Sequence, residues 1–151
     1  MKLAGVDYTY SSLYNLTFVA VRKMLRNDMA CYKARAEAVR HAEVYRGSFA
    51  ISVCPSENVE SPTIVGAQAA NELLNIIGIK ASFVLTEYND KIYISSRSID
   101  EINVQIIMEK LGGGGHLNVA GAQLEGVTIV QAKRMIQDTL DEMLKEGDIE
   151  E

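Results

Sequence analysis

Four consecutive glycines, Gly112 to Gly115, constrain this 151-residue chain more than any other feature. Each glycine loses more backbone freedom on folding than any other residue, so a run of four is unfavourable unless the backbone needs it. Such runs occur where a chain bends sharply or where another group approaches the backbone closely. Because His116 follows directly, we expect the approaching group to be an anion, most often a phosphate.

The bulk properties are those of a globular protein. The chain fits one domain, or one domain with a helical extension, and is long enough to bury its own core. Its net charge of -5 argues against electrostatic binding to long nucleic acids but allows a small phosphate ligand in a local pocket. Cys31 and Cys54 lack the spacing of a metal site or a disulfide framework, which indicates two buried thiols in a reducing compartment. No stretch approaches the roughly 20 apolar residues of a membrane span, and no signal peptide is visible, so we expect a cytoplasmic location.

The spacing of apolar residues predicts the order of elements. A period of three to four residues predicts helices over residues 11–43, 64–76, 102–111 and 128–145. Short apolar or alternating runs predict strands over residues 49–54, 81–88, 91–97 and 122–124. Asn89-Asp90 predicts a hairpin turn, Asn103 and Thr128 predict helix N-caps, and residues 146–151 a frayed tail. We therefore expect an α/β fold, with a mixed β-sheet flanked by helices and a long N-terminal connector helix.

The glycine run does not match the common phosphate-binding loops. No Gly-Lys-Ser/Thr follows it, which excludes a Walker loop, and its spacing differs from the dinucleotide fingerprint. A flexible backbone could still direct several N–H groups at one anion, with His116 donating a further hydrogen bond. The competing interpretation is a glycine-rich turn that packs tightly against the sheet, with His116 an incidental surface residue.

Arg97 is the second candidate for binding an anion. It lies in Ser95-Ser96-Arg97-Ser98 at the end of a predicted strand, and strand alternation places it on the same face as Tyr93. A surface ion pair is the competing role for a strand-end arginine. The predicted helix between Arg97 and the glycines spans only about 15 Å, so the strand end and the loop can converge.

The sequence contains none of the residue motifs that commonly activate water for hydrolysis. The chain has two histidines, and it contains no Asp-His-His, no His-x-x-x-His and no tight carboxylate cluster. We therefore predict no catalytic residue, no metal ligand and no cofactor within this chain.

Several segments together resemble the DHH-associated domain, the C-terminal half of the Asp-His-His phosphoesterases. The glycine–histidine motif with Val119-Ala120-Gly121 is the most specific, and Ser96-Arg97-Ser98 is similar to that domain's second motif. The resemblance covers residues 37–146. Segments that resemble the membrane-anchored cyclic-di-AMP phosphodiesterase branch are residues 42–46, 67–74, 79–84 and 102–105.

The resemblance implies a division of the chain and a role for each motif. Residues 41–151 would form the substrate-binding domain, and residues 1–40 a connector helix with a remnant of an upstream catalytic domain. Arg97 and Ser98 would hold a phosphate. Gly112, Gly113, Gly114, Gly115 and His116 would cradle the phosphate or sugar that is distal to the scissile bond.

The resemblance also implies an activity for the parent polypeptide. It would be a metal-dependent phosphodiesterase that hydrolyses cyclic-di-AMP to linear pApA, with Mn²⁺ held by an upstream Asp-His-His domain. This chain alone would be inactive. The expected partners are a cyclic dinucleotide or short oligonucleotide, the upstream domain and a second copy in a homodimer, with no membrane contact by this segment even if the parent is anchored. Two alternatives remain open: the corresponding domain of a RecJ- or nanoRNase-type enzyme acting on short oligonucleotides, and a non-catalytic nucleotide-binding module.

Overall fold

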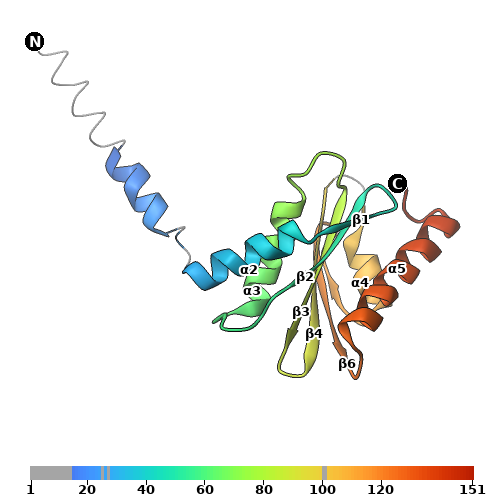
Figure 1. Ribbon diagram of the computed structural model, residues 1–151. Helices are drawn as coiled ribbons and strands as arrows, with labels where there is room; N and C mark the ends of the chain where they lie inside the picture. Colours follow the sequence, from blue (N-terminus) through green and yellow to red (C-terminus); the bar gives the residue numbers. More distant parts are fainter. Residues whose placement is uncertain (1–14, 25, 27, 100–101) are drawn as a thin grey trace, which may run out of the picture.

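A computed structural model describes residues 15–24, 26, 28–99 and 102–151. It contains one six-stranded sheet in the order β1-β2-β3-β4-β6-β5, with helices on both faces (Figure 1). Only the β2/β3 pair is parallel, and the other neighbouring pairs of the sheet are antiparallel. The strands are β1 Glu43–Tyr45, β2 Phe49–Cys54, β3 Ala81–Tyr88, β4 Lys91–Ser98, β5 Gly114–Gly115 and β6 Val119–Glu125. The predicted α/β fold with a mixed sheet flanked by helices is confirmed.

The β3–β4 hairpin forms where the sequence predicts it. Asn89 and Asp90 both have positive φ, 52° and 61°, as a two-residue turn that matches the strand twist requires. The strand predicted over 122–124 is longer than expected, since β6 runs from Val119 to Glu125. Ala120 and Gly121 have low strand propensity, so the sequence did not indicate a strand there. Pairing with β4 along seven positions stabilises the longer strand.

Two layers of helices pack against the two faces of the sheet. Helices α2 (Met29–Arg40) and α3 (Pro62–Leu73) pack on one face, and α4 (Val104–Lys110) and α5 (Ile129–Glu146) pack on the other. Strand alternation sorts the side chains between the two layers. The α4/α5 face holds Phe49, Ile51, Phe83, Leu85, Ile92, Ile94, Ala120, Ala122 and Leu124.

The α2/α3 face is covered over only part of its width. The apolar cluster beneath these helices takes Ala50 and Cys54 from β2 and Val84 from β3. Among the described residues it contains none from β4, β5 or β6. On β6 the side chains of Val119 and Gln123, which belong to this face, are exposed. One half of this face is therefore open, next to α3.

The N-terminal helical segment is present but is not one continuous helix. Residues 15–24 are helical and exposed, and they stand apart from the body of the protein (Figure 1). A second helix, α2, begins at Met29, because the carboxylate of Asp28 accepts a hydrogen bond from the N–H of Cys31 at 2.8 Å. The prediction of an unbroken helix over 11–43 was wrong at this cap. Its residues 11–14, 25 and 27 lie outside the described residues.

Helix α2 packs against the sheet. Ala34 and Ala38 are buried, and the Ser52 hydroxyl of β2 donates a hydrogen bond to the carbonyl of Ala38. The domain boundary at residue 40 stays a prediction, although this packing joins residues on both of its sides into one core.

Helix boundaries follow the predicted caps in most cases. Asn103 and Thr128 cap α4 and α5 as expected, and Thr128 forms a reciprocal capping box with Gln131. Helix α3 ends at Leu73, three residues earlier than predicted, and Ile76 is exposed rather than stacked in the core. The apolar period continues past Leu73, but tight turns before Gly78 replace the last helical turn.

The C-terminal tail is ordered, contrary to the prediction of fraying. Gly147 adopts φ 80°, and the N–H of Asp148 donates to the carbonyl of Met143 at 2.9 Å. This left-handed cap turns the chain back. It places Ile149, 5% exposed, in the core beneath α5.

Candidate functional site

The first two glycines of the run end helix α4. Gly112 adopts φ 85°, and its N–H donates to the carbonyl of Glu109 at 3.0 Å. The N–H of Gly113 donates to the carbonyl of Met108 at 2.8 Å. These two bonds form a Schellman motif, the common helix ending in which glycine takes the left-handed position. The chain then turns and enters β5.

Close packing explains two of the glycines. A Cβ on Gly113 would lie 2.1 Å from the carbonyl oxygen of Gly121, and a Cβ on Gly115 would lie 2.5 Å from the Cα of Ala120. Only glycine allows β5 to approach β6 this closely. The tight-turn interpretation is therefore correct for these residues, and the helix ending accounts for Gly112.

Neither close packing nor the helix ending explains why residue 114 is a glycine. A Cβ built on it would meet no atom within 4 Å, and its φ lies outside the left-handed region. Gly114 pairs with Gly121 of β6, which in turn pairs with Ser95 of β4. The missing side chain leaves the sheet surface bare at this point, which is what close approach of a ligand requires.

The backbone amides of the run are largely engaged within the protein. The N–H groups of Gly112 and Gly113 complete the helix ending, and the N–H of His116 donates to the carbonyl of Val119 at 2.7 Å. The N–H groups of Gly112, Gly113 and His116 are therefore not free to bind an anion in this conformation, and a cradle formed by Gly114 and Gly115 stays a prediction. The Arg97 and His116 side chains are the other candidate donors to an anion here.

Register aligns the predicted residues into parallel rows across β4, β6 and β5. Residues directly opposite in an antiparallel pair point to the same face. Alternate rows on that face lie about 7 Å apart along the strands. The rows are Arg97–Val119–His116, then Ser95–Gly121–Gly114, then Tyr93–Gln123. All three lie on the open half of the α2/α3 face.

Arg97 is a half-buried cation without a carboxylate partner among the described residues. Its Nη1 donates to the carbonyl of Ser96 at 2.8 Å, which uses one of five N–H donors. Burial lowers the pKa of the Arg97 guanidinium, although it remains charged at neutral pH. The competing role as a surface ion pair is not seen within the described part of the chain. A partly desolvated charge of this kind favours an anion from outside.

His116 lies beyond Val119 on the same row as Arg97. Its side chain is exposed and makes no hydrogen bond or ion pair with any residue that the structure describes. Two strand spacings, about 10 Å, separate the backbones of Arg97 and His116. The exposed Val119 lies between them on this row.

Ser98 occupies a different position from the other predicted residues. It is 5% exposed and lies on the α4/α5 side of β4, as alternation from Arg97 requires. Its hydroxyl donates to the carbonyl of Ile102 at 2.6 Å and accepts from the side-chain amide of Asn118 at 3.0 Å. These bonds hold the turn after His116, so the geometry favours a positioning role for Ser98 over contact with a ligand.

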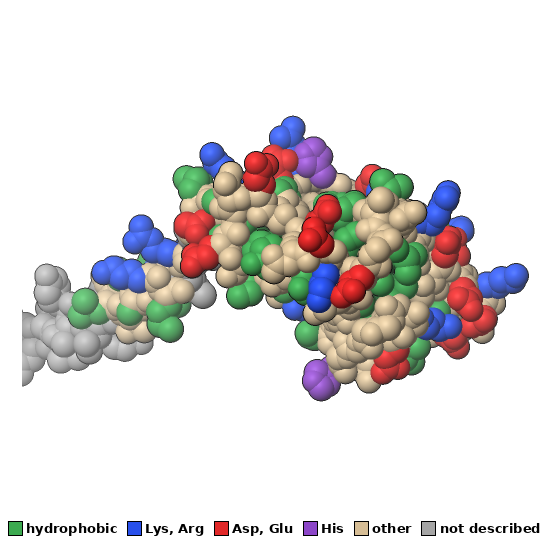
Figure 2. Space-filling model, turned by 90° about the horizontal axis from the view of Figure 1, so that it is seen from below, with side chains coloured by type: hydrophobic (Ala, Val, Ile, Leu, Met, Phe, Trp, Pro, Cys, Tyr) green, Lys and Arg blue, Asp and Glu red, His purple; other side chains and the backbone are tan. Residues whose placement is uncertain are grey.

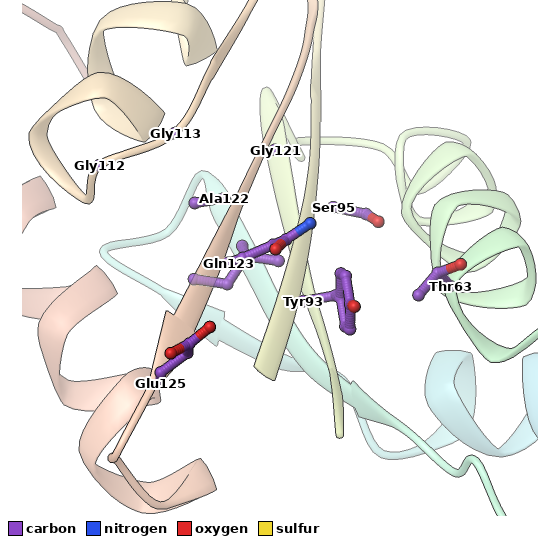
Figure 3. Close-up of a pocket in the computed structure, with 10 residues that line it drawn as sticks. Thr63, Tyr93, Ser95, Gly112, Gly113, Gly121, Ala122, Gln123 and Glu125 are labelled. Carbon is purple, nitrogen blue, oxygen red and sulfur yellow. The ribbon is translucent and has the colours of Figure 1, made fainter. Parts of the chain in front are cut away.

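A cavity of about 660 Å³ adjoins two of these rows, the one that contains Ser95 and Gly121 and the one formed by Tyr93 and Gln123 (Figure 3). Its lining includes Thr63 at the start of α3, Tyr93 and Ser95 of β4, and Gly121 and Gln123 of β6. The alternation of side chains along β4 is visible in the sequence, and it already places Tyr93 and Ser95 on the same face as Arg97. Thr63 and Gln123 join them only through helix packing and strand register, which no local pattern reveals.

Metal-binding and membrane-spanning features are lacking among the described residues. No group of three or more His, Cys, Asp or Glu side chains comes together there in a way that could hold a metal ion. None of the described helices combines the length and apolarity needed to cross a bilayer. On the face seen in Figure 2, acidic and basic side chains are interspersed rather than gathered by sign.

Residues 47–146 match the family model of the DHHA1 domain. The chain belongs to the DHHA1 domain family. This assignment confirms the resemblance drawn from the glycine–histidine motif. The matched range includes β2 to β6 and α3 to α5, and with them the three rows and the cavity.

The DHHA1 chain is similar to named phosphodiesterases. It is 42% identical over 124 residues to the cyclic-di-AMP phosphodiesterase PdeA of Listeria monocytogenes, covering 82% of this chain and 19% of that protein. It is 38% identical over 130 residues to the cyclic-di-AMP phosphodiesterase GdpP of Geobacillus thermodenitrificans, covering 85% and 20%. The chain therefore spans about a fifth of the length of these relatives.

A solved structure supports the DHHA1 fold. An exopolyphosphatase-related protein from Bacteroides fragilis superposes with a TM-score of 0.68 at 21% identity, covering 78% of this chain and 36% of that chain. At this identity the likeness concerns the fold alone.

Proposed function

We propose that this DHHA1 domain binds the phosphate of a nucleotide on the Arg97–Val119–His116 row. The observation that carries the proposal is the Arg97 guanidinium, which is half-buried and has no carboxylate partner among the described residues. A phosphate oxygen pair matches the planar fork of an arginine, and a histidine at the other side of the row can add a third donor. The bare surface at Gly114 supports the proposal, because it lets the ligand lie directly on the sheet.

The proposed ligand is cyclic-di-AMP or its linear product pApA. Its support is the similarity to the cyclic-di-AMP phosphodiesterases PdeA and GdpP, to which this chain is 42% and 38% identical. We further propose that the chain acts as the substrate-holding part of a longer phosphodiesterase, with a DHH domain upstream that binds Mn²⁺. The described residues offer no metal site, so their contribution is binding and orientation of the substrate.

The site sits in the cytoplasm under this proposal, and the parent reaches the membrane only through segments other than those described. A second copy of the chain is a further proposed partner.

Equilibrium titration of this chain with pApA tests the proposal. Arg97→Ala should weaken binding at least about tenfold, since charged hydrogen bonds contribute roughly 1.5–3 kcal/mol. Arg97→Lys should restore it only in part, because a lysine cannot form a bidentate pair. Arg134→Ala is the matched control, since it removes an exposed arginine from α5 on the other side of the sheet. Equal affinities of wild type and Arg97→Ala for pApA would overturn the proposal.

A further inference from the structure

The middle row on the open face is a trough. Ser95, Gly121 and Gly114 pair across three strands, and none carries a side chain larger than a hydroxymethyl group. The Arg97–Val119–His116 row borders the trough on one side and the Tyr93–Gln123 row on the other. The two bordering rows lie about 13 Å apart along the strands.

Tyr93 is an aromatic ring on this open face. It is half-buried, and in Figure 3 it lies between Gln123 of β6 and Thr63 of α3. Its ring makes one aromatic contact within the described chain, a tilted one with Tyr88 at 6.5 Å between centroids. Its hydroxyl makes no hydrogen bond with any described residue. The ring therefore adds little to the core of the protein, and it lines a cavity instead.

The side chains around Tyr93 match the edge of a nucleobase. Gln123 is directly opposite Tyr93 in the β4/β6 ladder, and its exposed amide offers both a donor and an acceptor. That pairing suits the N6 and N7 atoms of adenine, which glutamine can contact with two hydrogen bonds. The Thr63 hydroxyl on the α3 wall is a further donor or acceptor.

We infer that Tyr93, with Gln123 and Thr63, forms a purine-stacking subsite for the nucleotide whose phosphate Arg97 holds. The ribose lies in the trough over Ser95 and Gly121, and the base stacks on the Tyr93 ring. The phosphate binds at the end of the Arg97 side chain, so the distance from phosphate to base is shorter than the 13 Å between the rows and can be covered by one nucleotide. This inference rests on the proposed phosphate site and assigns the base that the same site accepts.

Two probes that differ only in the base test the subsite. The chain is titrated with adenosine 5′-monophosphate and with ribose 5-phosphate, each followed by NMR or calorimetry. Wild type should bind the nucleotide about tenfold or more tightly than the sugar phosphate, as stacking on an aromatic side chain provides. Tyr93→Ala should remove this preference without changing ribose 5-phosphate binding, and Tyr93→Phe should keep it.

Tyr32→Ala is the control, because it removes an exposed tyrosine from α2 away from the cavity. Ribose 5-phosphate binding that depends on Arg97, with no gain from the base in wild type, would overturn the purine subsite and leave the phosphate site standing. Preference for the nucleotide retained in Tyr93→Ala would do the same. Failure of wild type to bind either probe would overturn the phosphate site and this inference together. Should Tyr93→Ala unfold, the nucleotide preference of Gln123→Ala decides, with a loss of about threefold or more expected and no change contradicting the subsite.

Discussion

Gly113 and Gly114 are adjacent but differ sharply in the space around them, and alanine substitution should therefore affect stability differently at the two positions. On Gly113 a Cβ would lie 2.1 Å from the Gly121 carbonyl oxygen and 2.7 Å from Ala122, so β5 or β6 must shift. Such overpacking costs about 1–3 kcal/mol. In a chain of this length each kcal/mol lowers Tm by roughly 2–4 °C, so Gly113→Ala should melt about 2–12 °C lower than wild type.

Gly114→Ala should behave in the opposite way. Its Cβ meets no atom within 4 Å and its φ is outside the left-handed region, so the folded state accepts a methyl group. Loss of backbone freedom in the unfolded chain should then stabilise the protein by up to about 1 kcal/mol. Gly114→Val should likewise keep the fold, but its branched side chain stands over the trough and should weaken pApA binding.

Thermal unfolding followed by circular dichroism measures the first two variants, and a pApA titration measures the third. A Tm for Gly114→Ala as low as that of Gly113→Ala would refute the conclusion that Gly113 is closely packed and Gly114 is not. Unchanged pApA affinity in a folded Gly114→Val would refute the claim that Gly114 keeps the sheet surface open for a ligand.

Three further outcomes follow from the same structure. Burial raises the pKa of the Cys54 thiol to about 11, whereas an unfolded cysteine titrates near ~8.5. The folded state favours the neutral thiol, so its contribution to stability is complete below about pH 8.5 and falls as the pH rises toward 11. Denaturant unfolding should therefore show that the free energy of unfolding of Cys54→Ala declines less steeply with pH than that of wild type. Identical pH profiles of the two proteins would contradict this. Ile149→Ala should lower the free energy of unfolding by about 2–4 kcal/mol because the Ile149 side chain lies in the core. Glu150→Ala should change it little, because Glu150 is exposed. Equal melting temperatures of these two variants would show that the tail is frayed, as the sequence predicted. This chain with Mn²⁺ should not hydrolyse cyclic-di-AMP, and turnover above a protein-free control would show that it carries catalytic groups of its own.

Local patterns predicted the elements well where one signal dominates. The β3–β4 hairpin follows from Asn89-Asp90, and the caps of α4 and α5 follow from Asn103 and Thr128. The helix start at Asp28 was not predicted, because a strong apolar period continues on both sides of this capping residue. The burial of Ile149 was not predicted either, since an acidic tail with one isoleucine carries no periodicity.

The site was only partly predictable. The glycine–histidine motif and Arg97 were found, but the sequence could not divide the glycines into those that end a helix, those that pack and the one that stays open. That division depends on how closely β5 approaches β6, a tertiary distance that no local signal encodes. For the same reason Gln123 and Thr63, which register and helix packing bring to Tyr93, were not predicted.

An NMR titration of the ¹⁵N-labelled chain with pApA shows whether the ligand binds on the Arg97–Val119–His116 row, because chemical shifts report weak binding and its location together. We expect saturable shifts for a set of residues that share the open face across β4, β6 and β5, namely Ser95, Arg97, Gly114, His116 and Gly121. These shifts should disappear in Arg97→Ala and persist in Arg134→Ala. Shifts confined to α4 and α5 on the opposite face, or identical titrations of wild type and Arg97→Ala, would contradict binding on this row.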